Sequence, residues 1–83
     1  MLVREWSIPG AKPHTVRLEH RRLFSGKARV LLDGQVVYER GGFTFWDTGF
    51  ECRFLVDGLP CIVRALYRTW HYEYELWIDG KLQ

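Results

Sequence analysis

The sequence predicts an all-β protein, a compact antiparallel β-sandwich of about seven to eight short strands built from consecutive hairpins. Its 83 residues contain no amphipathic helix of convincing length. They contain short runs of β-branched and aromatic residues between glycine-containing turns. Four of these turns, at Gly10, Gly34, Gly58 and Gly80, follow one another at spacings of 24, 24 and 22 residues. This weak repeat, with one hairpin as its unit, and the short length predict a single domain over residues 1–83.

The alternation of residue types and the turns between them place seven strands along the chain. They are expected at residues 2–8, 14–20, 27–33, 35–40, 50–57, 60–67 and 71–79. The connections at 21–26 and 41–49 have no clear pattern, and the second of them carries three aromatic residues between glycines.

The third hairpin has the clearest register. A two-residue Asp-Gly turn at 57–58 pairs residue i with residue 115 − i. Phe54 then lies opposite Cys61 on an apolar face, and Glu51 lies opposite Arg64 on the other face as a favourable charge pair. A slip by one residue would break both patterns, so this register is well specified.

The second hairpin is less well specified, because a two-residue turn at 33–34 leaves both of its faces partly apolar. One face holds Ala28, Val30, Leu32 and Val37, and the other holds Arg29, Leu31, Val36 and Tyr38. Its orientation therefore stays open.

The last strand alternates clearly and places one tryptophan on its charged face. The core face holds Tyr72, Tyr74, Leu76 and Ile78. Trp77 falls on the opposite face among acidic residues, where an indole is not expected by default. The Asp-Gly turn at 79–80 then begins a fourth hairpin, whose return strand is at most residues 81–83.

Charge and hydropathy exclude several partners and compartments. The net charge is +2 and the basic residues are not clustered strongly, so no nucleic-acid partner is expected. No stretch is long and apolar enough for a membrane span, and the first residues do not form a signal peptide. With only two cysteines, a reduced, cytoplasmic protein is expected.

The sequence contains no recognisable catalytic or metal-binding pattern. Cys52 and Cys61 lie diagonally on the inner face of the third hairpin, too far apart for an easy disulfide, and we interpret them as buried free thiols. His14 and His20 share one face of the second strand, but no ligand spacing accompanies them. We therefore expect no enzymatic activity, no cofactor and no bound metal.

Three tryptophans are candidates for binding. Trp46 and Trp70 lie near connections, and Trp77 lies on a polar face. Exposed indoles can anchor a protein partner or stack on sugars. A small carbohydrate- or ligand-binding β-module is therefore the alternative to a protein-interaction module.

Four segments together resemble the Fas apoptotic inhibitory molecule family. They are HTVRLEH, SGKARVLLDGQVVYE, FECRFLVDGLPCIVRA and YEYELWIDGK, preceded by the Trp6-bearing first strand. Each motif alone is weak, but their order and spacing are fairly specific and span nearly the whole chain. The resemblance implies an all-β sandwich inside the cell that has no enzymatic activity. Animal members resemble adaptors that protect cells from receptor-driven death and protein aggregation, and they look like two such units, whereas this chain is a single-unit relative.

A sheet edge is the expected docking place. Since the fourth hairpin has so short a return strand, the last long strand is expected to be thinly covered, and such an edge is a template for another strand. We expect a protein partner or a second copy to dock there by strand addition, beside Trp77 and Leu82. Trp70 and Trp46 complete the candidate interaction surface.

Overall fold

The computed structural model describes residues 2–21, 27–41, 49–68 and 71–83. Within these ranges the chain forms strands and turns and no helix, so none is long and apolar enough to cross a membrane. The strands are β1 (Leu2–Ile8), β2 (His14–His20), β3 (Ala28–Leu32), β4 (Gln35–Arg40), β5 (Gly49–Val56), β6 (Leu59–Arg68), β7 (His71–Ile78) and β8 (Lys81–Leu82). The predicted all-β fold of seven to eight short strands is confirmed, and each predicted strand end lies within one residue of the observed one.

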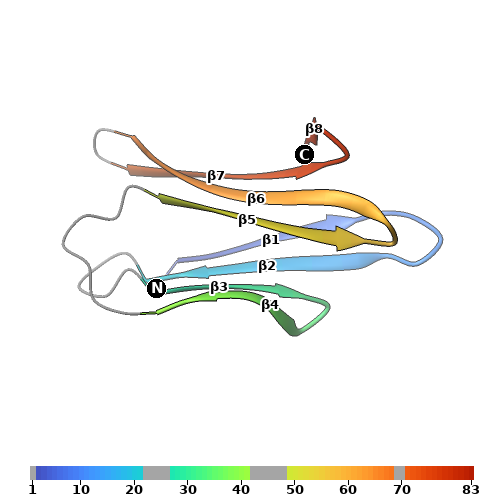
Figure 1. The fold of residues 1–83 in the computed structure, drawn as a ribbon, viewed down its shortest axis with the longest axis horizontal. Helices are drawn as coiled ribbons and strands as arrows, with labels where there is room; N and C mark the ends of the chain where they lie inside the picture. The colour runs from blue at the N-terminus through green and yellow to red at the C-terminus, as the bar shows by residue number, and fades with distance from the viewer. Residues whose placement is uncertain (1, 22–26, 42–48, 69–70) are drawn as a thin grey trace. The chain divides into compact units, whose positions relative to one another are not determined.

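The strands form two four-stranded antiparallel sheets of consecutive hairpins, in the orders β1-β2-β3-β4 and β5-β6-β7-β8 (Figure 1). The chain accordingly divides into two units, residues 1–47 and 48–83, each carrying one sheet. Within each sheet, strands that follow one another in sequence are also neighbours in space, as expected for strands joined by short connections.

Three Asp-Gly turns connect β3 to β4, β5 to β6 and β7 to β8. In each, the aspartate has a φ between 49° and 51° and the glycine a φ between 78° and 84°. Positive φ at both central positions identifies the type I′ turn, whose twist matches that of paired strands. The three predicted Asp-Gly turns, including the last one, are therefore present.

The first sheet has one buried face, supplied mainly by its two central strands. The fully or nearly fully buried side chains are Val16, Leu18, His20, Ala28 and Val30. They alternate along β2 and β3, which is the period-two pattern of a strand with one covered face.

The pairing register of the β3–β4 hairpin differs from that of a regular hairpin with a two-residue turn. Leu31 pairs with Val36 as the turn requires, but Val30 pairs with Tyr38, so a bulge shifts the register between Val30 and Leu31. The prediction that Tyr38 lies on the other face from Val30 is therefore wrong, because residues directly opposite each other share a face. Because both faces of this hairpin are partly apolar, no burial pattern holds the regular register, and an extra residue is accommodated.

The second sheet has the register that the turn at 57–58 predicts. Phe54 lies opposite Cys61 and Glu51 lies opposite Arg64, as expected. The buried side chains are Cys52, Val56, Cys61, Val63, Ala65 and Leu76. The opposite face of this sheet carries the charged residues and Trp77.

Candidate functional site

One row of side chains crosses the outward face of the second sheet from edge to edge. Arg53 on β5 lies opposite Ile62 on β6, Ile62 lies opposite Trp77 on β7, and Trp77 lies opposite Leu82 on β8. Side chains that lie directly opposite on neighbouring strands are in contact range, so the four form a continuous row of roughly 14 Å. We call Ile62, Trp77 and Leu82, together with Arg53, the Trp77 surface.

The Trp77 surface is hollowed and rimmed by charge. A shallow depression of about 450 Å³ is lined by Glu51, Arg53, Ile62, Arg64, Trp77 and Gly80. Ile62 and Trp77 are partly exposed, and Leu82 exposes 54% of its surface. An apolar centre with a polar rim is the usual composition of a surface that binds another protein.

The rim holds the indole of Trp77 in place. Its Nε1 donates a hydrogen bond to Oε1 of Glu75 at 3.2 Å. The same carboxylate lies 3.9 Å from Nη1 of Arg64, and Glu51 lies 2.9 Å from Nη2 of Arg53. The ring of Trp77 is thus fixed by a partner at its edge, and a fixed aromatic side chain loses little entropy on binding.

The structure brings two of the four predicted surface residues together. Trp77 and Leu82 lie directly opposite each other in the β7–β8 pairing. Trp46 and Trp70 lie outside the described residues, so a sugar-binding role for these three tryptophans stays a prediction. Ile62 and Arg53 were not predicted as part of the surface, although the register of the third hairpin already placed them opposite each other.

The return strand of the last hairpin is as short as the sequence indicated. β8 pairs with β7 at Trp77 and Ile78, and the backbone N–H of Gln83 donates to the carbonyl oxygen of Leu76 at 2.9 Å. Its position completes the Trp77 surface, because it supplies Leu82.

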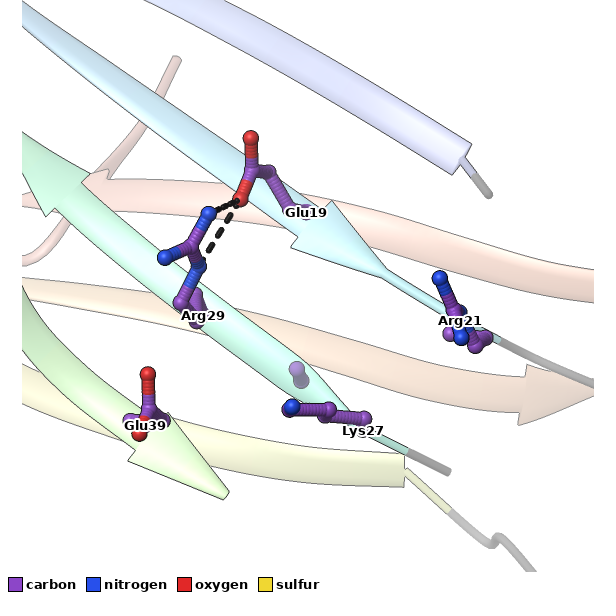
Figure 2. Close-up of a pocket in the computed structure, with 6 residues that line it drawn as sticks. Glu19, Arg21, Lys27, Arg29 and Glu39 are labelled. Atoms are coloured by element: carbon purple, nitrogen blue, oxygen red, sulfur yellow. Dashed lines mark hydrogen bonds and ion pairs between the residues drawn. The ribbon is translucent and has the colours of Figure 1, made fainter. Parts of the chain in front are cut away.

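A second hollow, of about 320 Å³, lies on the first sheet and is charged. It is lined by Glu19, Arg21, Lys27, Ala28, Arg29 and Glu39. Figure 2 shows the guanidinium of Arg29 turned toward Glu19, to whose Oε1 it donates two hydrogen bonds of 2.6 and 2.9 Å. Arg29 also lies opposite Glu39 in the β3–β4 pairing, so it stands between two acidic positions on neighbouring strands.

Glu19 is the centre of this charged group. Its side chain is only 11% exposed, and it also accepts a hydrogen bond from Nε of Arg17 at 3.1 Å. The hydrogen bonds from Arg29 in particular, and the one from Arg17, lower the pKa of Glu19 despite the opposing effect of burial. These hydrogen bonds connect β2 to β3 and pair Arg29 with a carboxylate of the same chain. This indicates that the charged group has a structural role.

The two cysteines are free and buried, as predicted. They occupy diagonal positions, since Cys52 lies opposite Val63 and Cys61 lies opposite Phe54. Burial raises the pKa of Cys52 to about 11 and raises that of Cys61 as well. Because the thiolate is the nucleophilic form, neither environment favours covalent catalysis.

The two histidines have separate environments. His14, at the start of β2, is hydrogen-bonded through Nδ1 to Oδ2 of Asp33 at 2.5 Å, and the backbone N–H of Thr15 donates to the other oxygen of that carboxylate. These hydrogen bonds, that of His14 first, lower the pKa of Asp33. His20 is fully buried at the other end of β2. Among the described residues, no three His, Cys, Asp or Glu side chains gather in a way that could hold a metal ion.

Comparison with known proteins agrees with the resemblance noted in the sequence. The model of the family described as Fas apoptotic inhibitory molecule (FAIM1) matches residues 2–83. No curated protein matches the chain. Because the family match covers the chain from its second residue to its last, this protein belongs to the Fas apoptotic inhibitory molecule family.

Proposed function

We propose that this chain is a non-enzymatic protein-interaction module of the cytoplasm, and that it holds apolar segments of other proteins on the Trp77 surface. The observation that carries this proposal is the row of Arg53, Ile62, Trp77 and Leu82 across all four strands of the second sheet. Tryptophan and arginine are enriched among the residues that dominate binding energy. The row places one of each beside two aliphatic side chains.

The chemistry of the surface supports a protein ligand with an exposed apolar side chain. Ile62 and Leu82 lie opposite Trp77 on the two neighbouring strands, so an apolar side chain placed on this row would have three apolar neighbours. Glu51, Arg53 and Arg64 line the depression and Glu75 lies beside Arg64, so the surrounding charges are of both signs. Such a rim suits a polar backbone better than a ligand of one charge.

Family membership gives this proposal a biological direction. The family is named for inhibition of Fas-driven apoptosis, which points to a role related to cell death or to protection from it. A role without catalysis is supported by the two buried cysteines, because burial raises their pKa and keeps both thiols protonated at neutral pH. A module that covers apolar segments would act by delaying their aggregation.

The test is an aggregation assay with matched surface variants. Light scattering by reduced insulin chains would be followed with wild type, with Trp77→Ala and with Leu82→Glu. Val36→Ala, which truncates an exposed side chain of the first sheet, serves as the control. We expect wild type and the control to delay aggregation equally and the two surface variants to lose most of the delay.

Two results would contradict the proposal. If wild type does not delay aggregation at molar excess, the ligand class is wrong. If Trp77→Ala delays it as well as wild type does, the surface is wrong. Unfolding midpoints of all four proteins, measured by circular dichroism, show whether any loss reflects an unfolded variant.

A further inference from the structure

The outer edge of β5 has a backbone and side-chain pattern that matches a second copy of itself. β5 is the outer strand of its sheet. Because the turn at 57–58 has two residues, Val56 and Leu59 form the first hydrogen-bonded pair with β6, and every second residue of β5 follows it. The alternate residues Glu51, Arg53 and Leu55 therefore direct their backbone N–H and C=O groups toward the outer edge.

Only a few registers allow two such edges to pair around a twofold axis. Each residue that directs its N–H and C=O groups outward must lie opposite a residue of the other copy that does the same. The twofold axis therefore passes through one residue position and not between two. An axis at Glu51 would oppose two glutamates, and an axis at Arg53 would oppose two arginines, which is unfavourable. An axis at Cys52 places Glu51 opposite Arg53 of the second copy, twice.

We propose that this chain forms a twofold dimer in which the β5 strands of two copies pair antiparallel about Cys52, joining their second sheets into one. This goes beyond the proposed function, because it concerns a second copy and the backbone edge of β5. Arg53, the outermost residue of the Trp77 surface, lies on that edge strand. In a single chain Glu51 forms an ion pair with Arg53 at 2.9 Å. In the dimer, Glu51 of each copy would instead pair with Arg53 of the other copy.

The remaining side chains agree with this register. Cys52 would face its own copy at a non-hydrogen-bonded position, where the backbones approach to about 4.5 Å, and its small side chain permits that approach. Phe50 would lie opposite Phe54 of the second copy, which extends the apolar inner face. Leu55, with 67% of its surface exposed, would lie opposite Gly49 of the second copy and cover a position without a side chain.

The other sheet edges match a second copy less well. On β1 an axis at Glu5 or at Arg4 opposes like charges, and an axis at Trp6 pairs no opposite charges. The β3–β4 hairpin carries the bulge between Val30 and Leu31, and a bulge twists a strand away from regular pairing. β8 has only two residues, and the part of β7 that it does not cover carries Glu73 and Glu75, so an axis at Glu73 or at Tyr74 opposes like charges. Among the described strands, β5 alone is both long and self-complementary in charge.

The test exploits the charge pattern by mixing two variants. Glu51→Arg leaves two basic side chains on the edge and Arg53→Glu leaves two acidic ones, so each variant opposes like charges in its own dimer. In an equimolar mixture the basic edge of one variant meets the acidic edge of the other. Sedimentation velocity from low micromolar to near-millimolar concentration would follow the average mass of wild type, each variant and the mixture.

We expect the mass of wild type to rise with concentration, each single variant to associate about tenfold or more weakly, and the mixture to recover. Glu73→Arg changes the net charge as Glu51→Arg does, but on β7, and should behave as wild type. The double variant with both β5 substitutions restores opposite charges at both positions and should dimerise again. Its dimerisation would show that the single variants lose association through charge and not through poor folding. A wild type that stays monomeric at every concentration overturns the proposal. A mixture and a double variant that associate no better than the single variants overturn it as well.

Discussion

Replacing Glu19 with glutamine tests whether the charged group on the first sheet stabilises the fold. The change preserves size and shape but removes the charge that accepts hydrogen bonds of 2.6, 2.9 and 3.1 Å from two guanidinium groups. Hydrogen bonds to charged groups contribute roughly 1.5–3 kcal/mol each in favourable surroundings. Since the side chains of Arg17 and Arg29 are 42% and 43% exposed, water can take over much of their solvation.

We therefore expect Glu19→Gln to lower the free energy of unfolding by about 1.5 kcal/mol in total, the low end of the range for a single such bond. In a domain of this size that corresponds to a fall of about 6–12 °C in the unfolding midpoint. The size of the effect should depend on pH. The folded-state pKa of Glu19 is lowered from its ordinary value of 4.5, so its contribution is complete above that value and is lost as the pH falls through the lower, folded-state pKa.

Thermal unfolding followed by circular dichroism, at about pH 7 and again at about pH 3, measures both effects. The control is Glu5→Gln, which removes an exposed carboxylate 3.0 Å from Arg17 and should cost less than about 1 kcal/mol. Equal midpoints for wild type and Glu19→Gln near neutrality would refute a stabilising role. A difference that stays the same at the acidic pH would show that the charge is not its cause.

Two further predictions follow from the second sheet. Cys52 and Cys61, both buried and with raised pKa, should react with a bulky thiol reagent far more slowly in the native protein than in urea, and rapid native labelling of both would contradict their burial. Gly49→Ala should cost at least about 2 kcal/mol in urea unfolding. Its φ is 109° and a Cβ there would overlap the carbonyl oxygen of Ala65. Gly80→Ala, at φ 78° and with open space around it, should cost about 1 kcal/mol. Equal costs for the two glycines would show that the contact with Ala65 relaxes.

The parts of the fold that depend on short-range signals could be predicted from the sequence. An Asp-Gly pair between two β-runs fixes both the turn type and the pairing of the residues beside it, so the hairpin at 57–58 has its predicted register. The burial pattern agrees with that register, because a shift by one residue would expose Cys52 and bury Arg53. Turn and face pattern are independent signals, and where they agree the prediction holds.

The β3–β4 hairpin shows where this reasoning stops. Its turn predicts the pairs nearest to it, and Leu32 does lie opposite Gln35. Further along, Val36 and Val37 are both exposed, so neither residue is held to one face by burial. A strand that gains little from either orientation can accept a bulge, and no residue in the sequence marks where the bulge falls.

The candidate site was predictable in its centre and not in its extent. Trp77 was identified because an indole stood on a charged face of an alternating strand. The row around it depends on three consecutive registers, which connect Arg53, Ile62, Trp77 and Leu82. The pairing of β6 with β7 spans a connection without a turn signature, so the sequence alone could not align Ile62 with Trp77.

The two edges of the second sheet differ in a way that bears on how the chain avoids open-ended association. β8 ends after two residues, so it offers little backbone to another strand. β5 is eight residues long, and a strand of that length at an edge favours pairing with other chains. Glu51 and Arg53 restrict that pairing, because one register about Cys52 joins opposite charges and the registers on either side oppose like charges. A pairing of that kind uses the β5 edge of both copies at once. It leaves at each end the short β8 strand and the part of β7 that β8 does not cover. The interface is then closed, so association should stop at two copies rather than continue into a fibre.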